Sequence, residues 1–71
     1  MRLFFDVVKQ NAPSYDFHGR EFGLPEEAAQ VAELIAVDLG SSETDDWVGS
    51  HVHVRNTAGE TLFSVPVLMA A

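Results

Sequence analysis

The chain has 71 residues, of which 46% are hydrophobic, so it is long enough for one small domain and too short for a second core. Eleven acidic and four basic side chains give a formal net charge of −7, which argues against nucleic acid or anionic membranes as partners and is compatible with a basic protein partner. The absence of cysteine excludes disulfides and thiolate zinc sites, so we expect oligomerisation to supply additional burial.

The N-terminal residues bear on the cellular compartment. Met1 to Asp6 contains one basic residue, and Asp6 comes too early for the apolar run of a secretion signal. No segment approaches the roughly 20 apolar residues of a membrane span. The expectation is therefore a cytoplasmic protein.

The first predicted strand covers Arg2 to Val8, where aromatic and β-branched residues are frequent. Asp6 has apolar neighbours on this strand, so we expect it to pair with Arg55 or His53 across the sheet and to be structural rather than catalytic. The alternation places Leu3, Phe5 and Val7 on one face and Phe4, Asp6 and Val8 on the other.

A second, shorter strand is predicted from about Ser14 to His18, returning antiparallel to the first after a loose turn at Lys9 to Pro13. Asp16 and Gly19 stand at the first and fourth positions that a type I turn favours. Such a turn would end this strand or bulge it before the helix.

A helix is predicted from Pro25 to about residue 39. Pro25 suits the first helical position, whereas Leu24 offers no side-chain oxygen as an N-cap. Gly40 is predicted to adopt the left-handed conformation just past the helix end. The residues that line one helical face are Ala28, Val31, Ala32, Ile35 and Leu39.

Ser41 to Asp46 reads as an acidic surface loop that leads to Trp47, which we expect to anchor the core or its rim. Val48 to Arg55 alternates cleanly and is predicted as a half-buried strand. A turn at Asn56 to Gly59 would join it to a final strand, Thr61 to Val67.

The predicted order is therefore β-β-α-β-β, an α+β fold in which residues 1–71 form a single domain. We expect a four-stranded antiparallel sheet of order 2-1-3-4, covered on one face by the helix. Pro66 favours an edge position for the last strand. The uncovered face is predicted to be a mixed apolar interaction surface formed by Phe4, Val8, His51, His53 and Leu62.

Three motifs carry a resemblance: Leu3-Phe4-Phe5-Asp6, Asp16-x-x-Gly19-x-Glu21, and Val54-Arg55-Asn56-x-x-Gly59-x-x-Leu62-Phe63-x-Val65-Pro66. Together they resemble a family of short, acidic, uncharacterised bacterial proteins, a domain of unknown function common in soil and plant-associated alphaproteobacteria. The resemblance covers most of the chain and implies no activity or functional residues. Family members place Asp near the helix start and Arg along the helix, whereas this helix has no Arg.

His51 and His53 are the candidate metal ligands. Two residues apart on a strand, their side chains would leave the same face about 6.5–7 Å apart, a spacing compatible with shared metal ligation. A third ligand would come from His18, Asp6 or Asp16. Two histidines in one row are also typical of a solvated or interface face.

Ser and Thr are the only nucleophiles, and none lies in a Gly-x-Ser-x-Gly motif. Gly19-x-x-x-Gly23 lacks the lysine of a phosphate loop. We therefore expect no enzyme and no cofactor. The first hypothesis is a protein-interaction domain, homodimeric through the open sheet face or an edge strand. The alternatives are a small metal- or ligand-binding protein that uses His51 and His53, and an acidic, antitoxin-like binder of a basic partner.

Overall fold

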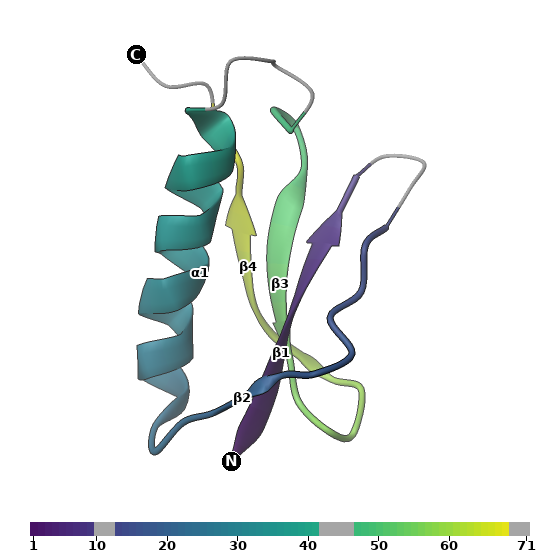
Figure 1. Cartoon of the computed structure of the whole chain (residues 1–71), viewed down its shortest axis with the longest axis vertical. Coiled ribbons are helices and arrows are strands. Elements are labelled where there is room, and N and C mark those ends of the chain that lie inside the picture. Colours follow the sequence, from purple (N-terminus) through teal and green to yellow (C-terminus); the bar gives the residue numbers. More distant parts are fainter. Residues whose placement is uncertain (10–12, 42–46, 69–71) are drawn as a thin grey trace.

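The computed structural model describes residues 1–9, 13–41 and 47–68, which form a helix packed on one face of an antiparallel sheet (Figure 1). The predicted α+β fold and strand order are confirmed, since the four strands lie in the order β2-β1-β3-β4. The centre of the first predicted turn, 10–12, and most of the acidic loop, 42–46, lie outside the described residues. The elements are β1 (Arg2–Val8), β2 (Arg20–Glu21), α1 (Pro25–Gly40), β3 (His51–Arg55) and β4 (Thr61–Pro66).

β1 has the predicted bounds and the predicted division of its side chains between two faces. In its pairing with β3, Phe5 lies opposite Val54 and Val7 opposite Val52. Leu3, Val52 and Val54 have no exposed surface, and Phe5 packs against them. The core therefore lies on the sheet face that α1 covers.

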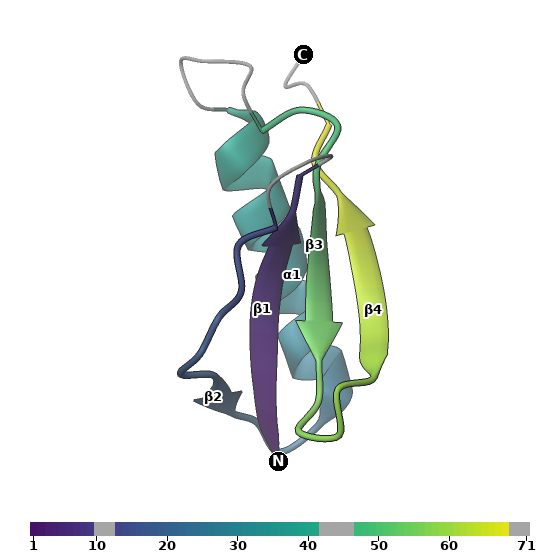
Figure 2. The ribbon, with the colours of Figure 1, turned by 90° about the vertical axis from the view of Figure 1, so that its right-hand side faces the viewer.

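α1 meets the sheet through small side chains. Ala28, Ala32 and Ala36 are buried at intervals of four residues, which place them in one row along the helix. Ile35 and Leu39 pack beside this row. In the view onto the strands, α1 lies behind the sheet (Figure 2).

Gly40 is the last residue of α1, so its predicted left-handed conformation past the helix end is wrong. An added Cβ at this position would overlap the carbonyl oxygen of Leu68, so the close approach of the C-terminal segment requires glycine here. At the other end, the Leu24 N–H donates to Oε1 of Glu27 over 3.0 Å. This bond is the reverse half of a capping box, while the Glu27 N–H, which a capping side chain would accept, donates to the Leu24 carbonyl oxygen over 3.2 Å.

The second strand is shorter and later than predicted. β2 covers Arg20–Glu21 instead of Ser14 to His18, where the chain makes only an isolated bridge to Val7. The reason is Asp16, whose Oδ2 accepts the Phe5 N–H over 3.3 Å and so replaces a strand carbonyl with a side chain.

The bounds of β3 and β4 also differ from prediction. β3 begins at His51 rather than Val48, because the chain turns at Gly49, whose φ is +91°. β4 ends at Pro66 rather than Val67. Its position at one edge of the sheet is the position that Pro66 predicts.

Trp47 closes one end of the core. It is half-buried and packs against the buried cluster, so the predicted anchor role is confirmed. Lys9 lies over its ring, with Nζ 4.1 Å from the ring centroid. This contact joins the end of β1 to the segment that precedes β3.

Candidate functional site

The structure places the predicted interaction face on the uncovered side of the sheet. Phe4 lies opposite Arg55 in the β1–β3 pairing, and Val8 lies opposite His51. Leu62 lies on β4, where a bulge shifts the register. The residues are thus assembled on neighbouring strands, and a partner for this face stays a prediction.

A buried ion pair occupies the centre of this face. Nε of Arg55 donates to Oδ2 of Asp6 over 2.8 Å, and Nη2 lies 3.4 Å from Oδ1. The Asp6 side chain is 5% exposed and the Arg55 side chain 27%. The hydrogen bond that Arg55 donates to the Asp6 carboxylate raises the pKa of Arg55 above its ordinary value, so the guanidinium stays charged. The structural pairing predicted for Asp6 and Arg55 is confirmed.

Asp16 connects residues 14–19 to the Asp6–Arg55 pair through hydrogen bonds. Its N–H donates to Oδ1 of Asp6 over 3.0 Å, and its carbonyl oxygen accepts from Nη2 of Arg55 over 3.2 Å. Its carboxylate accepts the N–H groups of His18 and Gly19 over 3.0 and 3.2 Å. Partial burial acts to raise the pKa of Asp16, but these amides and that of Phe5 outweigh it, and the pKa lies below the usual 3.8.

Asp16→Asn is expected to reduce the loss of stability in acid. A carboxylate with a depressed folded pKa stabilises the fold above its unfolded pKa, near 3.8, and this contribution disappears as the pH falls through the lower folded value. The variant should be about 1 kcal/mol less stable at pH 7, where it loses charge-assisted hydrogen bonds. Urea unfolding at pH 7 and below pH 3.8 should show this gap narrowing in acid. A constant gap would contradict the role of the charge.

The network also reduces the apolar surface of the open face. The Arg55 guanidinium lies 4.5 Å from the centroid of the Phe4 ring and covers part of it. Phe4, Val8 and His53 are half-buried. The open face is therefore more polar than the sequence pattern predicts.

The histidines of the metal-binding alternative are only partly brought together. The rings of His51 and His53 lie with their centroids 6.2 Å apart. His18 lies beside Arg2, whose guanidinium donates to its carbonyl oxygen. Within residues 1–9, 13–41 and 47–68, no three His, Asp or Glu side chains are grouped so that they could hold a metal ion.

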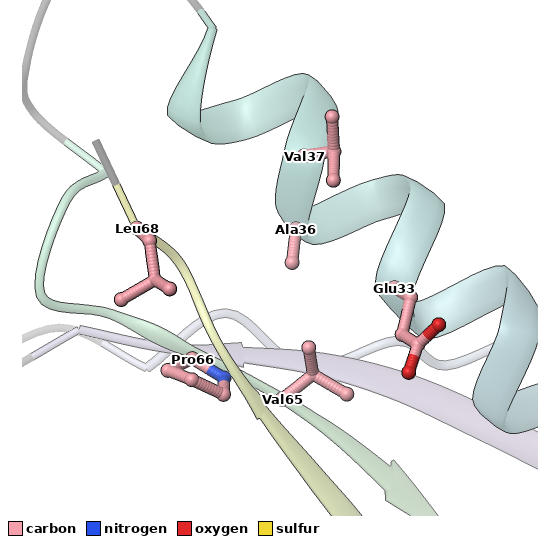
Figure 3. A pocket seen from close by; sticks show the side chains of 6 residues that line it. All are labelled: Glu33, Ala36, Val37, Val65, Pro66 and Leu68. Carbon is pink, nitrogen blue, oxygen red and sulfur yellow. The ribbon is translucent and has the colours of Figure 1, made fainter. Parts of the chain in front are cut away.

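A groove that the sequence analysis missed runs between α1 and β4 (Figure 3). Its volume is about 350 Å³. Val37 is 65% exposed and Leu68 70%, although both are apolar. The signal in the sequence was Val37 itself, an apolar residue outside the predicted buried stripe. The lining residues are Glu33, Ala36, Val37, Val65, Pro66 and Leu68.

β4 borders this groove with its outer edge. The Val67 N–H donates to the Ser50 carbonyl over 2.9 Å, so it points towards the neighbouring chain on the β3 side. Because successive residues of a strand point their backbone groups to opposite sides, the N–H and C=O of Ser64 point away from β3. β4 contains no charged residue, although lysine and other charges commonly protect such edges.

Comparison with protein-family models matches residues 2–68 to a domain of unknown function, DUF6894. No curated protein and no solved structure matches the chain significantly. Among the helical residues that the structure describes, none form a helix long and apolar enough to cross a membrane. The family match thus covers every strand and the helix, and it attaches no activity to them.

Proposed function

Because the chain belongs to the DUF6894 family of domains of unknown function, we propose a role from its own surface: a non-enzymatic protein-interaction domain that forms a homodimer through the outer edge of β4. The observation that carries the proposal is an uncharged six-residue edge strand beside an exposed apolar groove. An edge of this kind presents backbone donors and acceptors to another strand.

Apolar surface supports the edge as the point of contact. Val37 and Leu68 project from α1 and from the segment after β4, and both keep most of their surface exposed at the groove. Burying such side chains contributes about 1.5–3 kcal/mol each. A strand added to β4 would cover the groove and hydrogen-bond to the sheet at once.

The open sheet face is the weaker of the two surfaces expected for a dimer. Its centre is occupied by the Asp6–Arg55 pair and by the segment that Asp16 fastens across β1. These groups already satisfy one another, so a partner would gain little by covering them. The edge of β4 is therefore the more favourable contact surface for a second copy.

Charge supports the same choice. Two copies that each carry a formal charge of −7 repel one another, so they associate most readily where carboxylates are absent. Thr61 to Ala71 is a run of eleven residues without a charged side chain, and it includes all of β4. Among the described residues that line the groove, Glu33 is the one acidic residue.

Val37→Lys should raise the dissociation constant of the dimer about tenfold or more. The substitution replaces an apolar side chain that the dimer would bury with a charge that must be desolvated. Leu34→Lys is the matched control. Leu34 is 70% exposed on the same helix but does not line the groove, so its replacement should leave the dissociation constant nearly unchanged. Sedimentation equilibrium over a range of protein concentrations measures both constants.

A wild-type chain that sediments as a monomer at tens of micromolar would overturn the homodimer. Equal weakening by the two lysine variants would contradict the groove as the contact surface. Circular dichroism should give the same spectrum for both variants and the wild type, because both side chains are exposed.

A further inference from the structure

Backbone irregularities on both sides of Ser64 limit how another strand can pair with β4. On one side, the bulge between Phe63 and Thr61 shifts the register and interrupts a regular ladder. On the other side, Pro66 has no N–H to donate. Ser64 is the residue between them whose N–H and C=O both point outward.

We propose that two β4 strands pair antiparallel with Ser64 on the twofold axis, a register that rests on the homodimer proposed above. In this register each Ser64 N–H donates to the carbonyl oxygen of the partner's Ser64, which forms two reciprocal backbone hydrogen bonds. Pairing centred on Pro66 would lose both donors. Pairing centred on the bulge would meet an irregular backbone.

This register places apolar side chains of the two copies together on the helix-covered face. With Ser64 opposite the partner's Ser64, Val65 lies opposite the partner's Phe63. Val65 lines the groove, and Phe63 is half-buried on the same face of β4. The partner's Phe63 therefore lies beside the groove between Val65 and Val37, and twofold symmetry repeats the contact.

The other side of the seam is also apolar and uncharged. Leu62, which is 40% exposed, lies opposite the partner's Pro66. The second edge of the sheet is a poorer partner for β4, because β2 has only two residues and both are charged. Pairing of β4 with β2 of another copy would also be head-to-tail and open, whereas β4 with β4 closes as a dimer.

Ser64→Cys tests the register directly, because the chain has no cysteine of its own. Directly opposite residues of a hydrogen-bonded antiparallel pair have Cα atoms about 5.5 Å apart, within the range that a disulfide spans. Oxidised glutathione should therefore convert the variant to a disulfide-linked dimer, visible on a non-reducing gel. The expected rate is at least tenfold above that of Thr57→Cys, an exposed control in the β3–β4 turn.

A second measurement uses two variants in one mixture. Leu62→Cys and Pro66→Cys should cross-link to each other faster than either cross-links to itself. If Ser64→Cys is dimeric by sedimentation but cross-links no faster than Thr57→Cys, the Ser64 register is wrong and the homodimer stands. If it sediments as a monomer, the homodimer and the register both fail.

Discussion

Arg55→Met should lower the urea concentration at the midpoint of unfolding clearly, because it removes the cation that pairs with a carboxylate inside the sheet. The substitution leaves the Asp6 carboxylate, 5% exposed, without its cation. It also removes the hydrogen bond to the Asp16 carbonyl and the contact with the Phe4 ring. A domain of 71 residues has a total stability of roughly 4–10 kcal/mol, so the variant should unfold at a much lower urea concentration.

Arg20→Met is the matched control for this experiment. Arg20 is exposed and lies over the ring of Phe22 at 5.6 Å from the centroid, so its replacement should cost less than about 1 kcal/mol. Asp6→Asn combined with Arg55→Met should recover part of the loss, because the amide oxygen still accepts the Asp16 N–H without a buried charge. Equal losses for the two arginine variants would contradict a buried pair.

The Asp6–Arg55 pair also shows what could be predicted from the sequence. The alternation of apolar and polar residues along a strand predicts which side chains share a face. With the strand order 2-1-3-4, Asp6 lies on the same face as Arg55. The helix and both faces of β1 follow from the same periodicity. What periodicity could not give is the distance between the two charges, which depends on the register of β1 with β3.

Asp16 shows why the second strand was misplaced. Its segment resembles a strand in composition, but the side chain of Asp16 accepts the N–H groups of Phe5, His18 and Gly19 and so competes with strand pairing. The alternation pattern of a strand does not reveal hydrogen bonds between a side chain and the backbone. Asp and Gly at the first and fourth positions of a turn were the available signal.

The groove was missed for a different reason. It depends on how far α1 lies from β4, and this distance is set by the row of alanines and by Gly40. A sequence shows that Val37 is apolar, but it does not show how exposed this side chain is once the helix has packed on the sheet. The open sheet face could be predicted as an interaction surface because its residues alternate along the strands. The groove forms only when the helix packs against the sheet, so no pattern within one element predicts it.

Gly40→Ala should destabilise the fold by about 1–3 kcal/mol, although alanine is favoured over glycine inside helices by about 1 kcal/mol. The reversed sign comes from backbone overlap, since the new Cβ would meet the carbonyl oxygen of Leu68. To relieve it, the C-terminal segment must move, which strains the hydrogen bond from the Val67 N–H to Ser50. Thermal unfolding of the two proteins measures the difference.

Gly23→Ala is the control, because its added Cβ would lie 3.4 Å from the flexible carboxylate of Glu27. It should leave stability nearly unchanged, and a stabilised Gly40→Ala would show that Leu68 does not pack as described.

Gly40→Ala also connects the stability of the fold to the proposed dimer. Because Leu68 lines the groove, its displacement should also weaken self-association at temperatures where the variant is still folded. Stability lost with the dimer constant unchanged would place the contact surface away from the end of β4.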